Sequence, residues 1–137
     1  MPNQKTLSII KPDAIKAGVE NEINTIIKNS GLNILNSKKI TLTETEAKGF
    51  YSVHSDKPFF EELCQFMVSG PIIVQVLEGE NAVENYRKIM GATNPDEAID
   101  GTIRKLYANS IQENAVHGSD SEENAKKEIS FFFNDEA

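Results

Sequence analysis

One of the two histidines in this 137-residue chain has neighbours that suggest nucleophilic chemistry. His117 stands in "NAVHGSDS", ahead of a helix start that Ser119 and Glu122 predict by their capping-box spacing. The backbone N–H groups and the dipole at a helix N-terminus favour anions. Imidazole is a competent nucleophile near neutral pH when one ring nitrogen is free and the other is held. The pattern therefore indicates attack by His117 on an anionic group.

Glu128 and Ser119 are candidates to position this histidine. A carboxylate eleven residues after His117 could hold or orient the imidazole ring. Simpler interpretations remain open for all three residues. Glu128 is also typical of a solvated helix face, Ser119 of a helix N-cap, and a lone histidine of a purely structural role.

Three cations could meet a phosphate chain if the fold brings them near His117. Lys11 follows the first predicted strand, Arg87 lies on a predicted helix, and Arg104 lies in a long irregular segment. Each of them alone is typical of a surface charge. Their spacing in the sequence does not determine whether they converge.

Several other kinds of site are excluded by their missing motifs. The chain has neither the G-x-x-x-x-G-K-[ST] phosphate loop nor the G-x-G-x-x-G dinucleotide fingerprint. It also lacks a zinc-type Cys/His cluster and the G-x-S-x-G turn of serine hydrolases. Its single cysteine, Cys64, shares a helical apolar stripe with Phe60, Leu63 and Met67, which favours core packing.

Length and charge indicate one globular domain over residues 1–137 that acts in the cytoplasm. The formal net charge is −7, from 21 acidic and 14 basic residues, which disfavours nucleic acids and anionic membranes as partners. Apolar runs are too short for a membrane span, and the first residues lack the apolar region of a secretory signal.

The elements expected from periodicity and capping signals alternate along the chain. Strands are predicted at 6–10, 32–42, 71–79 and 129–133, the last with Ile129, Phe131 and Phe133 on one face. Helices are predicted at 20–31, 56–70 and 81–91, from Thr43 through Phe50, Tyr51 and His54, and briefly after Ser119. Residues 92–116 are expected to form a long functional loop with at most one short helical piece.

With the extra helices set aside, this order is strand–helix–strand–strand–helix–strand. It predicts an α+β sandwich of the ferredoxin-like βαββαβ type, with a four-stranded antiparallel sheet and a long loop before the histidine. That fold supports many functions, so function depends on the site.

Six motifs in the same order make the chain similar to nucleoside diphosphate kinases over essentially its whole length. They are "SIIKPDAI", "FYSVHSDKPFFEEL", "SGPIIVQVLEGENAV", "GATNP", "GTIRKLYA" and "ENAVHGSDSEENAKKEISFFF". The N-x-x-H-G-S-D-S block is highly specific for that family. The resemblance implies ping-pong transfer of a γ-phosphate from a nucleoside triphosphate, mainly ATP, to a diphosphate by way of His117.

The resemblance also implies the roles of the other site residues. Ser119 and Glu128 match the residues that position the histidine, and Phe59 matches the aromatic that stacks on the base, with Leu63 and Ile111 beside it. Contacts to phosphate and ribose fall on Lys11, Tyr51, Arg87, Thr93, Arg104 and Asn114. Stacking without reading the base edge would tolerate every base.

The cofactor and partners follow from the same resemblance. Mg²⁺ is expected on the nucleotide phosphates and not in a protein cage. The chain ends soon after residue 133, which resembles the shorter bacterial members and favours a homotetramer, with a hexamer as the alternative. Two other functions stay open: a nucleotide sensor without chemistry, and a phosphohistidine carrier that donates to another protein.

Overall fold

The computed structural model describes residues 3–52, 55–111 and 113–133. Its strands are β1 (Asn3–Ile10), β2 (Asn33–Ile40), β3 (Ile72–Glu80) and β4 (Val116–Gly118). Its helices are α1 (Pro12–Ala17), α2 (Glu20–Asn29), α3 (Glu44–Phe50), α4 (Phe60–Met67), α5 (Ala82–Met90), α6 (Ile103–Tyr107) and α7 (Glu122–Phe132), with a 3₁₀ turn, η2, at Pro95–Glu97.

The four strands form one antiparallel sheet in the order β2-β3-β1-β4. This confirms the ferredoxin-like arrangement expected from the sequence. The nearly all-apolar β3 lies between β1 and β2, where both of its faces are covered. The short β4 pairs with β1 at an edge, so that its residues lie at the rim of the sheet.

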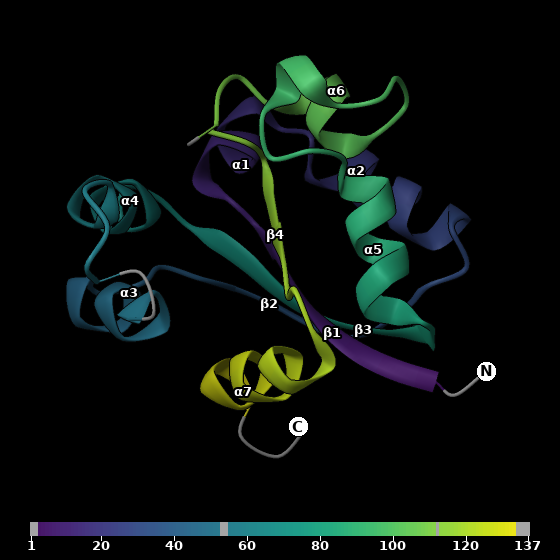
Figure 1. The fold of residues 1–137 in the computed structure, drawn as a ribbon, viewed down its shortest axis with the longest axis horizontal. Coiled ribbons are helices and arrows are strands. Elements are labelled where there is room, and N and C mark those ends of the chain that lie inside the picture. Colours follow the sequence, from purple (N-terminus) through teal and green to yellow (C-terminus); the bar gives the residue numbers. More distant parts are fainter. Residues whose placement is uncertain (1–2, 53–54, 112, 134–137) are drawn as a thin grey trace.

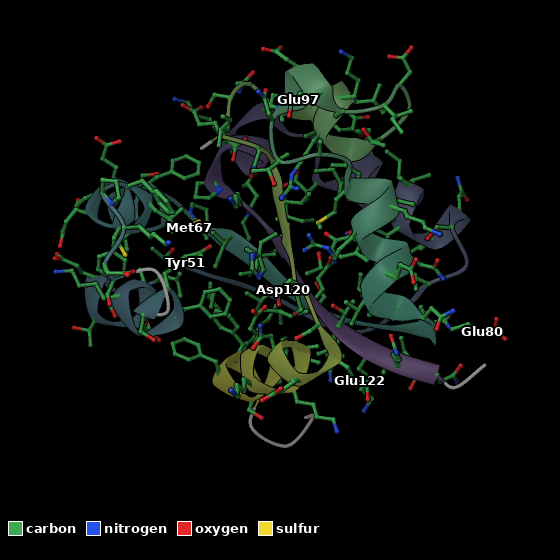
Figure 2. All side chains as sticks on the ribbon, in the orientation of Figure 1. Tyr51, Met67, Glu80, Glu97, Asp120 and Glu122 are labelled. Atoms are coloured by element: carbon green, nitrogen blue, oxygen red, sulfur yellow. The ribbon has the colours of Figure 1, made fainter. Side chains whose placement is uncertain are left out.

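Helices cover both faces of the sheet, and alternate residues of each strand point into one core or the other. Figure 1 shows α2 and α5 on one side and α3, α4 and α7 on the other. In β1, Leu7 and Ile9 pack toward α3, α4 and α7, whereas Ile10 packs toward α2 and α5. In Figure 2, Tyr51 and Met67 lie inside, whereas Glu80, Glu97 and Glu122 lie at the periphery.

Most element boundaries follow local signals that the sequence carries. Thr43 and Glu46 form the predicted capping box at the start of α3, with bonds of 3.1 and 2.9 Å. Gly31 and Gly91, at φ +94° and +88°, follow the ends of α2 and α5 in a conformation that L side chains rarely adopt. The one described cysteine, Cys64, is buried in the core as expected. Within the described part of the chain, the helices lack the length and apolar character that crossing a membrane requires.

The predicted final strand at 129–133 is wrong. This segment belongs to α7, in which Ala125, Ile129 and Phe132 are buried at helical spacing while Phe131 is 42% exposed. Three alternating apolar residues fit a strand and a helix equally well, and the helical period is the one that matches the core. The fourth strand is β4, which contains His117 itself.

The expected boundaries before and after His117 also need correction. Residues 92–116 contain η2 and α6, and α1 precedes α2 where a single helix was predicted. The N-cap of α7 is Ser121, whose hydroxyl accepts from the Asn124 amide at 3.0 Å, so the prediction of Ser119 as the cap is wrong. The helix ending at Phe50 carries Tyr51 as its C-cap, and His54 lies outside the described residues.

Candidate active site

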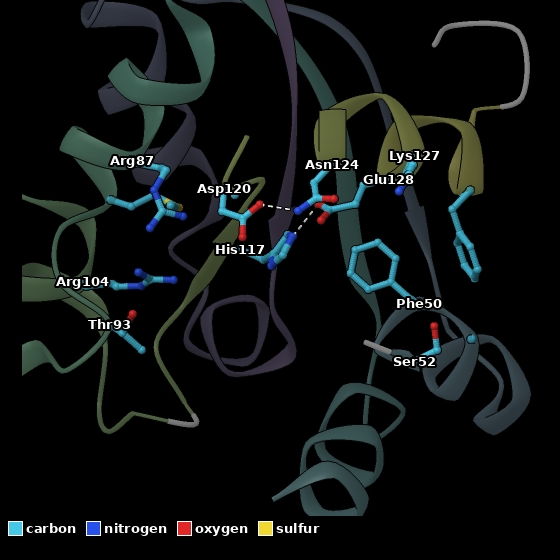
Figure 3. Close-up of a pocket in the computed structure, with 14 residues that line it drawn as sticks. Phe50, Ser52, Arg87, Thr93, Arg104, His117, Asp120, Asn124, Lys127 and Glu128 are labelled. Atoms are coloured by element: carbon cyan, nitrogen blue, oxygen red, sulfur yellow. Dashed lines mark hydrogen bonds and ion pairs between the residues drawn. The ribbon is translucent and has the colours of Figure 1, made fainter. Parts of the chain in front are cut away.

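A cleft of about 560 Å³ opens beside β4, at the edge of the sheet, and His117 lies in its lining. Figure 3 shows Arg87, Arg104 and Thr93 on one side of His117, and Phe50 and Ser52 on the other. The fourteen lining residues come from five elements and their flanks: Gly49, Phe50, Ser52, Arg87, Met90, Thr93, Arg104, His117, Gly118, Asp120, Asn124, Lys127, Glu128 and Phe131.

The His117 ring is held on one side by α7. Its Nε2 atom lies 2.8 Å from Oε1 of Glu128, and the Ser119 hydroxyl donates to the same oxygen at 2.8 Å. The His117 and Glu128 side chains are only 21% and 22% exposed, so bulk water screens this contact weakly. A carboxylate only accepts hydrogen bonds, so Nε2 carries the proton and the Nδ1 lone pair is left available.

Aromatic rings pack against the same imidazole. The Phe50 and Tyr51 rings lie 5.4 and 6.3 Å from the His117 ring, both edge-on. Phe50 also contacts Phe131, at 5.5 Å between centroids, so α3 and α7 form one wall of the cleft. These contacts restrict rotation of the ring about its side-chain bonds.

The two arginines of the opposite wall are held very differently. Arg104 is 8% exposed and donates to the carbonyls of Gly91, Asn114 and Val116, at 3.1, 3.3 and 2.8 Å. Burial lowers the Arg104 pKa, and the nearby Arg87 lowers it further. Arg87 is exposed on α5 and lines the cleft. Arg104 therefore joins the end of α5 at Gly91 to the turn at 114–116, whereas Arg87 is open to solvent.

Lys11 lies behind this wall, bonded to Asn114. Its Nζ donates to Asn114 Oδ1 at 2.8 Å, and the side-chain Nδ2 of Asn114 donates to the Thr93 carbonyl at 3.5 Å. The Lys11 pKa is lowered to about 8, mainly by burial and also by the nearby charge of Arg104, while the charge of Asp13 opposes the shift. Because β1 and β4 are neighbours, residues 103 positions apart meet here.

The turn that leads into β4 is strained at Ala115. This residue has φ +74°, and the Val116 amide donates to the Asn114 carbonyl at 2.8 Å, which closes a three-residue γ-turn. A left-handed conformation costs a non-glycine residue about 1–2 kcal/mol. Asp13 Oδ2 accepts from the Ala115 amide at 3.1 Å, and burial raises the Asp13 pKa.

Gly118 allows β4 to approach α5 closely. A Cβ atom at this position would lie 2.7 Å from Tyr86 Cδ2 and 2.8 Å from Met90 Cε. Tyr86 is fully buried and bonded to the Ser8 hydroxyl at 2.7 Å, so its ring has no room to move aside. The residue next to His117 must therefore be glycine for the strand to pack here.

The structure gathers most of the predicted site residues but not all. Those that line the cleft are Arg87, Thr93, Arg104, His117 and Glu128; Lys11, Asn114 and Ser119 are bonded to this group, and Tyr51 packs on the histidine. Phe59, Leu63 and Ile111 are not among the lining residues; Phe59 and Ile111 are 45% and 59% exposed, and Leu63 is half-buried against the core.

Sequence reasoning did not select several residues that the structure places here. Phe50, Asp120, Asn124, Lys127 and Phe131 line the cleft. The sequence pattern predicts Phe50 and Phe131 only as parts of a helix and a strand. For Phe50, a signal was available in its position next to Tyr51, which is a predicted site residue. For Asp13, the available signal was its position directly after the "KP" that ends the first strand.

Comparisons with known proteins agree on one family. The nucleoside diphosphate kinase family model matches residues 4–137. The nucleoside diphosphate kinase of Campylobacter lari is 62% identical over 95% of each chain, and that of Methylorubrum extorquens is 55% identical over 98% of this chain and 96% of the relative. The Aquifex aeolicus enzyme superposes with a TM-score of 0.95 at 40% identity over 96% of each chain. A Halobacterium salinarum enzyme solved in complex with CDP gives 0.92 at 37% identity, over 96% of this chain and 88% of that one.

Proposed function

Because this chain belongs to the nucleoside diphosphate kinase family and has that family's activity, we propose that it transfers phosphate through His117. The donor is a nucleoside triphosphate, mainly ATP, and the acceptor is a nucleoside diphosphate, so the reaction maintains nucleoside and deoxynucleoside triphosphate pools. The observation that supports this most directly is the Glu128 contact at Nε2, which leaves Nδ1 for the phosphate.

The reaction runs in two displacements at phosphorus, in which the same nitrogen is first the nucleophile and then the leaving group. In the first, the Nδ1 lone pair attacks the γ-phosphorus, the bond to the β-phosphate oxygen breaks, and the diphosphate leaves with the electron pair. In the second, the terminal oxygen of another diphosphate attacks the phosphohistidine, and the N–P bond breaks. Glu128, hydrogen-bonded at Nε2, stabilises the positive charge that the ring gains in the first displacement.

The cations provide the positioning on which phosphoryl transfer mainly depends. Arg87 and Arg104 contact the phosphate chain from one wall of the cleft, and Lys11 and Asn114 act from behind it. Thr93 contacts the phosphates or the ribose, and Tyr51 acts through its packing against the imidazole. Ser119 holds the carboxylate of Glu128 in place.

The base-binding residues lie away from the lining of the cleft. Phe59 is 45% exposed, as a ring that stacks on a base must be in the free protein, and Leu63 and Ile111 flank the base. Stacking on Phe59 uses the π-face that every base has, which accounts for a broad range of nucleotides.

Residues 1–137 act as one domain in this proposal, in the cytoplasm.

Mg²⁺ is brought by the nucleotide. In the described ranges, no group of three or more histidine, cysteine, aspartate or glutamate side chains is arranged to hold a metal ion, whereas phosphate oxygens are ligands that Mg²⁺ prefers. When bound, the ion neutralises charge on the β- and γ-phosphates.

The active form in this proposal is a homo-oligomer. A tetramer is favoured, and a hexamer is the alternative. The exposed apolar side chains of Ile99 and Leu106, at 78% and 53%, are suited to burial against another subunit. Size-exclusion chromatography with light scattering measures the subunit number.

A two-stage transfer experiment tests the role of His117. Wild type, His117→Ala and His54→Ala are each incubated with γ-labelled ATP and Mg²⁺, and acid-labile, base-stable label on the protein is counted. GDP is then added and labelled GTP is measured. We expect label on wild type and His54→Ala that moves to GDP, and none on His117→Ala.

Each other outcome contradicts the proposal in a different way. Transfer by His117→Ala would exclude that residue as the carrier. Nucleotide binding without labelling in wild type would favour the sensor. Labelling without release to GDP would favour the carrier that donates to another protein.

A further inference from the structure

We propose that Asp13 is a positioning residue for phosphoryl transfer, because its carboxylate holds the strained turn at Ala115 that sets the position of His117. The inference rests on the proposed function, since it takes His117 as the phosphate carrier. It adds that the reaction also depends on Asp13, a residue that does not line the cleft.

Both backbone polar groups of Ala115 are held by the segment that follows β1. Its amide donates to Asp13 Oδ2 at 3.1 Å, and its carbonyl accepts from the Lys11 amide at 2.8 Å. The second bond is backbone to backbone and does not depend on side chains. The first depends on Asp13 alone.

A residue at φ +74° keeps that conformation only where its surroundings fix it. Without the Asp13 contact, only the carbonyl of Ala115 is held, by the Lys11 amide, and the Ala115 amide can turn toward the ordinary region of negative φ. Asn114 and Val116 flank Ala115 and their carbonyls both accept from Arg104, so a rotation at Ala115 also changes the geometry of these two bonds. His117 follows Val116 directly, so this rotation displaces the imidazole relative to Arg104 and Lys11.

A simpler role for Asp13 is to place a negative charge in the first turn of α1. Two observations favour the positioning role over this one. Oδ2 is directed to a residue 102 positions away, and α1 has only six residues, so its dipole is small. Burial also raises the pKa of Asp13, so an ionised carboxyl at this position is costly, as is common at functional sites.

Two substitutions of Asp13 separate its hydrogen bond from its charge. Asp13→Asn keeps an oxygen that can accept from the Ala115 amide but removes the charge. Asp13→Glu keeps the charge but moves the acceptor by one methylene. The rate of phosphohistidine formation is measured by rapid quench, and exchange of the Ala115 amide hydrogen is followed by NMR.

Measured well below pH 8, where Lys11 keeps its proton even without the nearby Asp13 charge, Asp13→Asn should form phosphohistidine at a rate close to wild type. Asp13→Glu and Asp13→Ala should be slower by roughly ten- to a hundredfold, because a misplacement of about 1 Å in a reacting group costs on the order of 10²-fold. Exchange of the Ala115 amide should be faster in those two variants and unchanged in Asp13→Asn.

A second substitution tests the strain directly. Glycine adopts positive φ freely, so a chain with glycine at position 115 should depend less on Asp13. We expect Asp13→Ala to reduce the rate much less in the Ala115→Gly background than in wild type. A role confined to the end of α1 predicts no recovery. If Asp13→Ala does not fold, judged by its thermal transition, the Asn and Glu variants still decide.

Any of three results would overturn the inference: Asp13→Asn as slow as Asp13→Glu, a normal rate in Asp13→Ala, or no recovery in the double variant. His117→Ala, run in parallel, separates this from failure of the proposed function. If His117→Ala still forms a phosphoprotein, the carrier is misassigned whatever the Asp13 variants do. If it forms none, a normal rate in Asp13→Ala refutes the positioning role alone.

Discussion

Nε2 of His117 lies 2.8 Å from Oε1 of Glu128, and this contact determines which ring nitrogen can react. The carboxylate is fixed in turn by the Ser119 hydroxyl, which donates to the same oxygen. A nitrogen that carries a proton and donates it to a carboxylate has no lone pair for attack.

We therefore expect the phosphoenzyme to carry its phosphate on Nδ1 of His117. Antibodies that distinguish the two phosphohistidine isomers, or ³¹P NMR of the denatured phosphoprotein, identify the nitrogen. Phosphate on Nε2 would contradict the geometry described here, because the Glu128 contact would have to break first.

Removing the charge of Glu128 should slow the formation of phosphohistidine. Glu128→Gln can still present an oxygen to both donors but cannot stabilise the charged ring. We expect a loss of about 10–100-fold, by analogy with the carboxylates that orient metal-binding histidines. Ser119→Ala should have a smaller effect. Rapid-quench rates measure both, and an undiminished rate in Glu128→Gln would exclude an electrostatic role.

Lys11 should limit activity at alkaline pH. Its pKa in the free protein is about 8, and kcat/KM reports the free enzyme, so kcat/KM should fall as pH rises through 8 and Lys11 loses its proton. Lys11→Arg keeps its charge at all these pH values and should lack this limb, even if its activity is lower throughout. A limb of unchanged position in Lys11→Arg would assign it to another group.

The same group should make the protein more stable where it is less active. The unfolded chain protonates Lys11 up to about pH 10.5 and the folded chain only up to about 8, so between these values unfolding takes up protons and its free energy rises with pH. The full effect is roughly 3 kcal/mol, since one pKa unit corresponds to about 1.36 kcal/mol. Urea unfolding at pH 7, 8, 9 and 10, with Lys11→Met as the control, measures the difference.

Replacing Arg104 should lower stability as well as activity, whereas replacing Arg87 should lower activity alone. Arg104 donates to three carbonyls from a buried position, and Arg87 is exposed. Lysine cannot reproduce the guanidinium fork, so Arg104→Lys should cost about 1.5–3 kcal/mol of unfolding free energy and Arg87→Lys less than about 0.5. Equal stabilities would mean that the three bonds contribute little.

Gly118→Ala should destabilise the fold and displace β4. The added Cβ would overlap Tyr86 and Met90, and overpacking of this kind costs about 1–3 kcal/mol. Gly49→Ala is the matched control: its Cβ would come no closer than 3.5 Å to Phe131, and alanine favours a helix by about 0.8–1 kcal/mol. Thermal unfolding of both variants tests the contrast; a neutral Gly118→Ala would show that the α5 contact can yield.

The sequence predicts the elements whose signals are local. The capping box at Thr43, the glycine after α2 and the apolar run of β3 each depend on a few adjacent residues. The strand that carries His117 has no such signal, because three residues are too few to display a period. It forms because β1 has a second edge to pair, which is a property of the assembled sheet.

The same distinction applies to the site. Residue types and the motif around His117 indicate the chemistry, but the contacts that organise it span most of the chain. Asp13 reaches Ala115 across 102 positions and Lys11 reaches Asn114 across 103. Their meeting follows from the pairing of β1 with β4, whereas the sequence pattern predicts the fourth strand at residues 129–133.

Lys11 and Arg104 have a further consequence for the catalytic cycle. Two cationic side chains are buried near one another, Arg104 in the lining of the cleft and Lys11 behind it, and each has its pKa lowered by burial. In the proposed function, the phosphate chain of the nucleotide lies against this pair of cations and offsets their charge. The substrate would then serve, in each of the two displacements, as a temporary counter-ion for buried charges of the fold.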